Sequence, residues 1–506
     1  MSVSPAVLGL DLGTQSTKAA LVALDGRPLG SHAVAVDFQR PQPGWGEQSP
    51  DLLLQSALTA IKALTDRFPQ TDIIGVGIAA QMGGVIGVAE NFEAVTPHEM
   101  WLDTRADADR EELLAAHGPE ILAKNGIIPF VTPRVRRWLR LDPDLEKRLV
   151  RVVAPAGYLV GRLTGAAAHE AVCDRTQANL FGCFDVAANK WDVDLAERCG
   201  LPARLLPRIA DPFEIAGRIS AEIAALCGLT AGTPVAAGMG DGTGGWLAAG
   251  GVEPGICIDT SGSSAHFAVT VDRFVTDPDG LLSCMPSAAP GRFYLLGFTT
   301  STGLAHRWLR ETFGKSYEEL EVLAAQTPRG SNGILAVPHF NGRVSPFEAS
   351  IKGAFIGFDD KTGPGDFYRA LLEASAFELN GWLSAARRLA PDVALSTVVN
   401  VGGGARNGLW NRIKADVTGL SLWTAQSEVN AARGAALAAS IAVGATGLAD
   451  TKWFSPDYLA VERFDSDAAG HAAYAPSSES YQTLTEQLLP VYRTLQKLRQ
   501  AKREPS

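Results

Sequence analysis

The segment Leu8–Gly26, LGLDLGTQSTKAALVALDG, limits the fold more than any other part of the sequence. Two short apolar runs flank a tip of Gly, Thr, Gln and Ser residues. Asp25 and Gly26 then signal a second turn before the alternating run SHAVAVDF. Apolar runs joined by such turn residues are typical of antiparallel strands. The segment therefore predicts a three-stranded meander, with Asp11 just before the first tip and Lys18 just after it.

The same pattern returns in the second half of the chain. IDTSGSSAHFAV (258–269) again places Gly, Ser and Thr between two apolar runs, and VVNVGGGARNGLW (398–410) leads an apolar run into a glycine-rich loop. This repetition indicates two related halves that meet near residue 250. We therefore expect an N-terminal domain at residues 1–248 and a C-terminal domain at residues 249–506.

Helix and strand signals alternate along most of the chain. SPDLLLQSALTAIKALTDRF offers Ser49 as N-cap, Pro50 at the first helical position and apolar residues at helical spacing. The following DIIGVGIAAQM (72–82) is typical of a buried strand. Such alternation predicts an α/β protein with mixed sheets covered by helices.

Composition argues against several classes of function. The 506 residues carry a net charge of -10, whereas nucleic-acid binding needs clustered Lys and Arg. The only basic run, KLRQAKREPS at the end, is interpreted as a solvated terminus. No run approaches the ~18 apolar residues of a membrane span. The six cysteines include no Cys-x-x-Cys pair, so we expect reduced thiols in a cytoplasmic protein.

The Gly-, Ser- and Thr-rich tips suggest phosphate binding. A tip of this kind can turn backbone N–H groups and hydroxyls toward one anion, and the missing Cβ atoms allow close approach. A carboxylate beside a polyphosphate is repulsive unless a cation lies between them, so Asp11 is the candidate ligand for Mg²⁺. The alternative is a plain hairpin in which Asp and Thr side chains satisfy turn amides.

Two further patterns have competing interpretations. GDGTGG (240–245) matches the G-x-G-x-x-G of dinucleotide-binding turns, but no acidic residue follows at a strand end at the expected distance. FGKS (313–316) is similar to the end of a Walker loop, yet Leu309 stands where its first glycine should be. We interpret FGKS as a helix end followed by a new N-cap.

Seven spaced motifs together resemble the FGGY carbohydrate kinases, and most of all their xylulokinase branch. They are GLDLGTQSTK, GWGEQSP, GIAAQMGG, GMGDGTGG, DTSGSS, GAFIGFDDKTGPGDFYRALLE and VGGGARNGLW, in that order from Gly9 onward. The resemblance implies two ribonuclease-H-like domains of the actin and hexokinase type around a central cleft. It also implies ATP and Mg²⁺ as cofactors and a small sugar as substrate.

The resemblance assigns the nucleotide side by position. Asp11, Thr14 and Lys18 correspond to the first phosphate loop of the family. Thr260, Ser261 and Gly262 correspond to the second phosphate loop. Gly403, Gly404, Ala405 and Asn407 correspond to the adenosine loop.

Asp241 corresponds to the catalytic aspartate of the family. A sugar hydroxyl loses its proton late in a loose transition state, so a nearby carboxylate suffices as the base. The alternative is that Asp241 caps a helix beginning near Gly245.

The sugar side is expected from Gln81, Met82, Trp101 and Asp103, together with Asp241. Polyol recognition needs carboxylates and amides to pair hydroxyl groups, and Asp103 offers a carboxylate. Trp45 and Glu47 match an aromatic and acidic loop of the family, in contact with the sugar or bracing the loop.

Three departures from the family fall around the sugar side. Gly83 stands where His is typical after Gln-Met, Val135 where Lys is usual before Trp138, and Leu102 where Asn is usual.

The resemblance as a whole implies phosphorylation of a terminal hydroxyl of a small sugar, with D-xylulose leading and ribulose, xylitol or erythritol as alternatives. An actin-like ATPase and an oxidoreductase built on GDGTGG are more distant alternatives. Homodimers are common among such kinases, although no apolar stripe marks an interface.

Overall fold

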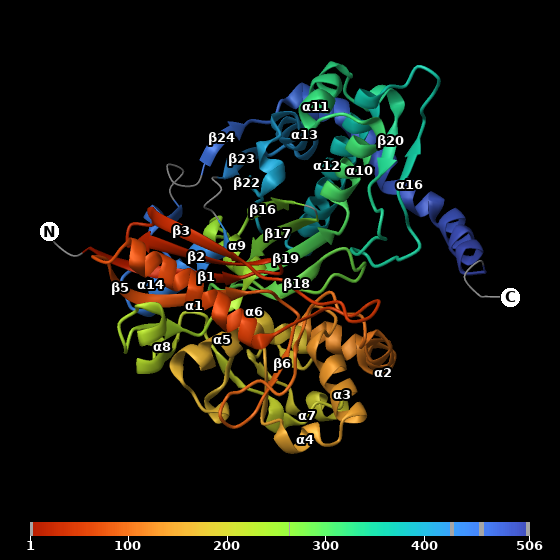
Figure 1. The fold of residues 1–506 in the computed structure, drawn as a ribbon. Helices are drawn as coiled ribbons and strands as arrows, with labels where there is room; N and C mark the ends of the chain where they lie inside the picture. Colours follow the sequence, from red (N-terminus) through yellow and green to blue (C-terminus); the bar gives the residue numbers. More distant parts are fainter. Residues whose placement is uncertain (1–3, 263, 426–429, 455–459, 502–506) are drawn as a thin grey trace.

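The computed structural model describes residues 4–262, 264–425, 430–454 and 460–501. They form two halves, each built on a seven-stranded mixed sheet (Figure 1). The α/β fold predicted from the sequence is confirmed.

The first sheet carries the opening meander at its edge. Its strands, in spatial order, are β13 (Ile215–Arg218), β14 (Pro234–Ala236), β5 (Asp72–Ala80), β1 (Pro5–Leu12), β2 (Ser16–Ala23) and β3 (Pro28–Ala35), with β15 (Met239–Gly240) also pairing with β5. β1, β2 and β3 are antiparallel, and β1 is parallel to β5. The predicted meander is therefore confirmed, and Asp11 lies opposite Lys18 in its register.

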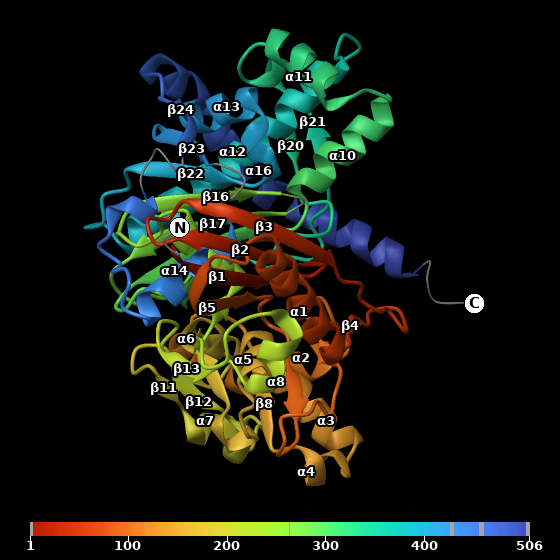
Figure 2. The ribbon, with the colours of Figure 1, turned by 60° about the vertical axis from the view of Figure 1, so that its left-hand side comes forward.

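The second sheet repeats this arrangement. Its order is β18 (Ser283–Pro286), β19 (Phe293–Thr299), β17 (Ala265–Val271), β16 (Ile256–Ser261), β22 (Thr397–Val401), β23 (Ser421–Ala425) and β24 (Ala460–Phe464). Again an antiparallel hairpin, here β16 and β17, is followed across the sheet by parallel pairing, here β16 with β22. Figures 1 and 2 both place β1–β3 close to β16 and β17, where the two halves meet.

Helices and short strand pairs complete both halves. The first half contains α1 (Pro50–Arg67), α2 (Asp107–Asn125), α3 (Val131–Leu141), α4 (Leu145–Arg148), α5 (Pro155–Thr164), α6 (Arg175–Ala178), α7 (Val193–Arg198), α8 (Ala221–Cys227) and α9 (Asp241–Ala248). Its short pairs are β4 (Glu47–Gln48) with β7 (His98–Glu99), β6 (Ile86–Val88) with β8 (Arg151–Val153), β9 (Val172–Asp174) with β12 (Arg208–Ala210), and β10 (Phe184–Asp185) with β11 (Lys190–Trp191). The second half contains α10 (Thr302–Phe313), α11 (Tyr317–Gln326), α12 (Pro364–Leu389), α13 (Gly408–Thr418), α14 (Ala431–Ala442), α16 (Ala468–Ala501) and the pair β20 (Leu335–Val337) with β21 (Ala354–Ile356).

The capping residues predicted from the sequence are confirmed. Ser49 accepts a hydrogen bond from the N–H of Leu52, and α1 begins at Pro50. α10 ends at Phe313, Gly314 takes a left-handed conformation, and Ser316 caps α11. FGKS is thus a helix end followed by a new N-cap.

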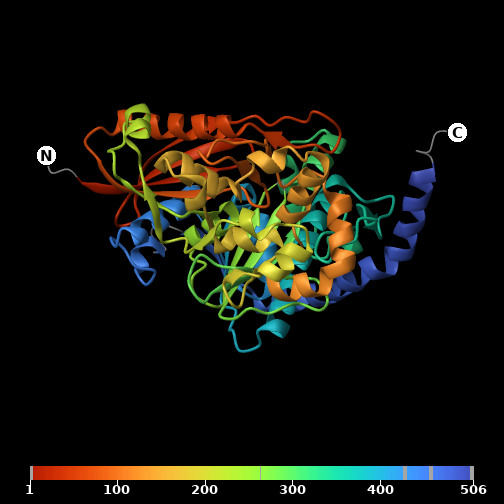
Figure 3. The ribbon, with the colours of Figure 1, turned by 90° about the horizontal axis from the view of Figure 1, so that it is seen from below.

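Helix α14 comes from the second half of the sequence but packs on the first sheet, against β1 and β5. Close approach depends on glycine, because a Cβ at Gly9 or Gly77 would overlap the carbonyl oxygens of Ala432 or Ala435. The C-terminal end of α16 extends away from the body (Figures 1 and 3). In the described part of the chain, no helix is long and apolar enough to cross a membrane. All six cysteines are buried, free thiols.

Candidate active site

Asp11 and Asp241 lie at the same edge of the first sheet. Asp11 on β1 pairs in register with Ala79 of β5, and Met239 of β15 pairs with the same Ala79 from the other side. The carboxyl ends of these parallel strands therefore bring Asp241, two residues after Met239, close to Asp11. Lys18 lies opposite Asp11 on the hairpin.

Burial makes both carboxylates costly to ionise, and the charge of Asp11 adds to that cost at Asp241. Burial, reinforced by the charge of Asp11, raises the pKa of Asp241 to about 7. Burial raises the pKa of Asp11 to about 6, although Lys18 opposes the shift. Asp11 also has one buried carboxylate oxygen without a hydrogen-bond partner among the described residues. A cation would relieve both the repulsion and the missing contact.

The residues fit a magnesium ion that is shared with a phosphate chain. Within the described ranges, no group of three or more His, Cys, Asp or Glu could hold a metal by itself. Mg²⁺ commonly takes one or two carboxylates, with waters and substrate phosphates as its other ligands. Asp11 meets that requirement.

Helix α9 begins at Asp241 itself, so the alternative in which Asp241 caps a helix beginning near Gly245 is wrong. Gly240 is the N-cap, and Asp241 accepts a hydrogen bond from the N–H of Gly242 at 2.7 Å. The N–H of Gly240 donates to the hydroxyl of Thr176, which in turn donates to Asp174. Asp241 is thus a first-turn residue that its flanking backbone holds in place, and it does not serve as the N-cap.

The first hairpin tip is held at Thr14. The side-chain amide of Gln48 donates to the Thr14 carbonyl at 3.0 Å, and the indole N–H of Trp101 donates to the Thr14 hydroxyl at 3.2 Å. Lys18 and Thr14 are at least partly exposed, so both can meet a ligand. Trp101 is 49% exposed.

Two of the expected sugar contacts are engaged within the protein. The Asp103 carboxylate accepts from the N–H of Gly46 and from the guanidinium and N–H of Arg105, and its side chain is fully buried. Burial alone would raise its pKa, but these hydrogen bonds bring the pKa below its ordinary value. Gln81 is also buried and donates to Gln48 at 2.7 Å. This geometry supports a bracing role for both, whereas Met82 packs against Gly240, next to Asp241.

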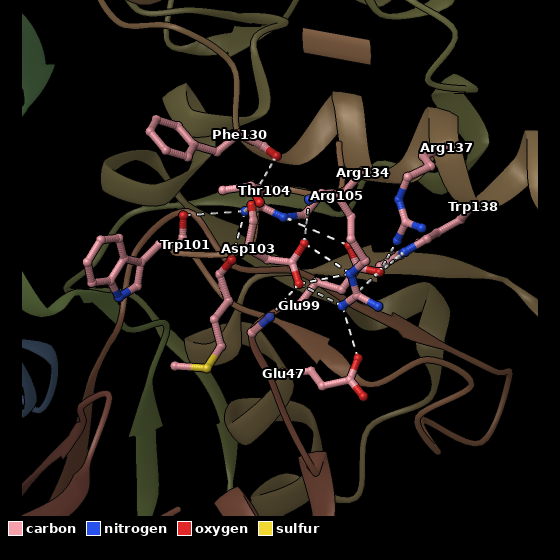
Figure 4. A network of polar contacts seen from close by, with 12 residues as sticks. Glu47, Glu99, Trp101, Asp103, Thr104, Arg105, Phe130, Arg134, Arg137 and Trp138 are labelled. Carbon is pink, nitrogen blue, oxygen red and sulfur yellow. Dashed lines mark hydrogen bonds and ion pairs between the residues drawn. The ribbon is translucent and has the colours of Figure 1, made fainter. Parts of the chain in front are cut away.

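Arg134 organises the same region and was missed by sequence reasoning. Its buried guanidinium donates to backbone carbonyls of five residues, Gly83, Met100, Trp101, Asp103 and Phe130 (Figure 4). Burial lowers its pKa to about 10. Burial raises the pKa of nearby Glu99, which accepts from Trp138 and Arg137. No local signal in FVTPRVRRWL distinguishes Arg134 from Arg136 and Arg137.

Trp45 and Glu47 brace this network. The Arg105 guanidinium lies 4.0 Å from the centroid of the Trp45 ring, and it pairs with Glu47 at 2.9 Å. Both residues therefore fix the loop that carries Gly46 and Gln48.

Gly83 has a left-handed backbone, with φ of +73°. A Cβ there would come within 3.3 Å of the Phe130 ring. A histidine at this position would be strained and crowded. The ring of Phe130 lies against the place where a side chain at position 83 would begin.

The second hairpin and the glycine-rich loop 402–407 pack directly on each other. A Cβ on Gly402 would lie 2.7 Å from the carbonyl oxygen of Ser261, and one on Gly404 would lie 2.6 Å from its Cβ. Buried Lys414 donates to the Ser261 hydroxyl and to Asp259. The Ser261 hydroxyl is therefore occupied inside the protein, and the exposed neighbours Gly262 and Gly403 remain on the surface. Sequence reasoning missed Lys414, which is buried within α13.

Asn407 also has a structural duty. Its side chain caps α13 through the N–H of Trp410 at 2.8 Å and donates to Glu321 at 2.8 Å. Helix α13 begins directly after it. The predicted residues thus lie in two groups, one in each half of the chain. One contains Asp11, Thr14, Lys18, Gln81, Met82, Trp101, Asp103 and Asp241, and the other contains Thr260, Ser261, Gly262, Gly403, Gly404, Ala405 and Asn407.

Known proteins of one family are similar to nearly the whole chain. Residues 6–248 match the N-terminal domain of the FGGY family of carbohydrate kinases, and residues 258–443 match its C-terminal domain. The xylulose kinase of Escherichia coli K12 is 28% identical over 96% of this chain and 99% of its own. That of Bacillus subtilis 168 is 26% identical over 96% of each chain. The crystal structure of xylulose kinase from Rhodospirillum rubrum superimposes with a TM-score of 0.88 at 26% identity, over 96% of this chain and all of that chain.

Proposed function

The chain belongs to the FGGY family of carbohydrate kinases and is a sugar kinase, and on that premise we propose that its substrate is D-xylulose, phosphorylated at a terminal hydroxyl. Asp241 is the general base, and Asp11 holds Mg²⁺. The actin-like ATPase and oxidoreductase interpretations do not fit this family.

The pair Asp11 and Asp241 carries the proposal. A sugar kinase needs an acceptor for the hydroxyl proton and a cation for the phosphates. Of the two neighbouring carboxylates, Asp241 would accept the proton and Asp11 would hold the cation. Burial raises the pKa of Asp241, so its carboxylate holds a captured proton better than an exposed aspartate would. The first helical turn of α9 begins at Asp241, so backbone hydrogen bonding fixes where its carboxylate points.

Mg²⁺, when bound, neutralises charge on the β- and γ-phosphates. The protein's own contribution is to position those phosphates. Lys18 lies opposite Asp11 on one hairpin, and Thr260 and Gly262 lie at the end of the other. Their charge and N–H groups oppose the negative charge that spreads over the transferred group.

D-xylulose is supported by the similarity of the chain to the xylulose kinases of Escherichia coli and Bacillus subtilis. Gly83 supports the second candidate, another short ketose or polyol. The Phe130 ring lies against Gly83, so this wall of the proposed sugar site is apolar. A substrate with fewer hydrogen-bonding demands on that side would fit it equally well.

The test is ADP release with Mg²⁺-ATP across D-xylulose, D-ribulose, xylitol, erythritol and water alone. We expect D-xylulose to give the highest kcat/KM. Asp241→Asn should lower kcat by about 10²–10⁴-fold, the usual contribution of a general base. The exposed Asp37 provides a matched control, and Asp37→Asn should behave as the wild type.

Each result separates the parts of the proposal. Stimulation by a different sugar would overturn D-xylulose and keep Asp241 as the base. Full activity of Asp241→Asn would overturn the assignment of the base.

A further inference from the structure

Two segments beside the first hairpin form one braced unit, which we call the sugar-side loops (residues 44–48 and 98–105). β4 and β7 pair between them, and the N–H of Met100 and of Thr104 donate to the carbonyls of Gly46 and Gly44. Asp103 ties Gly46 to Arg105. These contacts make the two segments move together.

The sugar-side loops grip the first phosphate hairpin at Thr14. Gln48, from the first segment, holds the Thr14 carbonyl at 3.0 Å. Trp101, from the second segment, holds the Thr14 hydroxyl at 3.2 Å. Gln48 is itself fixed because its carbonyl oxygen accepts from Gln81 at 2.7 Å and lies 3.3 Å from His98.

The chemistry of the Trp101 contact gives it a direction. An indole N–H can only donate, so the Thr14 hydroxyl must accept, and its own proton is left free to donate elsewhere. A hydroxyl that accepts one hydrogen bond becomes a better donor in the next, because such chains polarise one another. The hydroxyl proton of Thr14 is thus prepared for a phosphate oxygen.

Trp101 also has a surface for a second ligand. Nearly half of its side chain is exposed, and its backbone carbonyl is anchored by Arg134 at 3.5 Å. In Figure 4 its ring points away from the buried polar network, to the same side as the ring of Phe130. The indole can therefore contact a sugar while its N–H contacts the hairpin.

We propose that Trp101 couples the two substrates: a sugar resting against the indole fixes its N–H on Thr14, which orders the hairpin for the phosphates of ATP. Gln48 is the second connection in the same coupling. This inference rests on the proposed function, because it needs a sugar beside Trp101 and phosphates beside Thr14. Trp101 acts here as a positioning residue for the nucleotide.

The measurement is the dissociation constant of Mg²⁺-AMP-PNP by titration calorimetry, with and without saturating D-xylulose. For the wild type we expect the sugar to tighten nucleotide binding by about fivefold or more, the usual lower range of coupling between sites. Trp101→Phe keeps a ring and removes the N–H, so it should lose most of that coupling. Gln48→Met should lose part of it.

Three comparisons make the result specific. Thr14→Val should lose the same coupling, and Trp101→Phe combined with Thr14→Val should lose no more than Thr14→Val alone, because both remove one hydrogen bond. Trp308→Phe is the matched control, since Trp308 is 43% exposed on α10 in the other half, and it should retain full coupling.

The outcomes distinguish this inference from the proposed function. If D-xylulose is phosphorylated but nucleotide affinity is the same with and without it, the coupling is wrong and the activity stands. Retention of the full ratio by Trp101→Phe would also overturn the role of Trp101. Lack of turnover with every sugar of the panel would reject the proposed function itself.

Discussion

The carboxylate of Asp241 should cost the metal-free protein stability. Burial and Asp11 raise its pKa from 3.8 to about 7, so between these pH values the folded state binds more protons than the unfolded state. Stability then falls as the pH rises through this window. We therefore expect Asp241→Asn, assayed in EDTA, to be more stable than the wild type at pH 8 by about 1–2 kcal/mol, although its kcat should be lower. Thermal unfolding at pH 8 and pH 4 measures the difference.

The pH comparison is the control in that experiment. At pH 4 most of the wild-type carboxyl is protonated in the folded state, so the advantage of the variant should shrink. An advantage of equal size at both pH values would mean that Asn acts through packing, and the explanation from ionisation would be rejected.

Lys414 holds the second hairpin through a buried ion pair with Asp259, and it also donates to Ser261. Burial lowers the pKa of Lys414. Lys414→Met would leave Asp259 as a buried, unpaired charge, which we expect to cost about 3 kcal/mol. Combining it with Asp259→Asn should recover most of that loss, because removing both charges is often close to neutral. Urea unfolding of Lys414→Met, Asp259→Asn and the double variant provides the measurement.

The two Lys414 variants also separate stability from binding. The double variant lacks the contact that fixes Ser261, so its KM for ATP should stay raised by about threefold to tenfold after stability has recovered. A double variant with wild-type KM for ATP would show that Lys414 serves the fold alone.

At the scale of elements, the docking of α14 on the first sheet depends on absent side chains. A Cβ at Gly77 would overlap the carbonyl oxygen of Ala435. Gly77→Ala should therefore push the helix away from β5 and destabilise the protein by about 2–3 kcal/mol. Gly381→Ala is the matched control, because Gly381 lies inside α12 with no atom within 4 Å of the new Cβ. It should gain about 0.5–1 kcal/mol from helix propensity. Equal effects of the two changes would contradict this explanation.

Elements that depend on neighbouring residues could be predicted from the sequence. The hairpin of β1 and β2, the N-cap at Ser49 and the helix end at FGKS each follow from a few adjacent residues, and all are confirmed. The start of α9 was misplaced because the run DGTGG has poor helix propensity. The strand pairing of β15 and the hydrogen bond from Gly240 to Thr176 impose the helix there instead.

Side-chain roles in the candidate site were harder to predict, since their partners are far apart in the sequence. Asp103 has the composition of a sugar ligand, yet Gly46 and Arg105 occupy its oxygens. The side-chain NH₂ of Gln81 donates to Gln48, while its carbonyl oxygen has no partner among the described residues. No local pattern reveals that Arg134 gathers carbonyls from three loops. Positions that parallel strands impose, such as Asp11 beside Asp241, were within reach of a family resemblance.

At the scale of the whole molecule, the two sheets each carry one side of the proposed nucleotide site. Asp11 and Thr14 lie on the first, and Thr260 and Gly262 lie on the second. A phosphate chain held by both hairpins must draw the halves together, and closure would exclude water as a competing phosphoryl acceptor. We therefore expect Mg²⁺-AMP-PNP and D-xylulose together to lower the radius of gyration in small-angle X-ray scattering, and each alone to lower it less.

Asp11→Asn is the informative variant for this closure. It removes the carboxylate that would share Mg²⁺ with the phosphates but keeps the shape of the side chain. Both hairpins should then hold the nucleotide less firmly, so the decrease in radius should be smaller at the same ligand concentrations. The contacts of α14 with β1 and β5 link the halves at a second place, so the motion should be a hinge-like closing without separation of the domains. An unchanged radius for the wild type with both ligands would mean that the halves already lie at their closed distance, and that water is excluded without a domain movement.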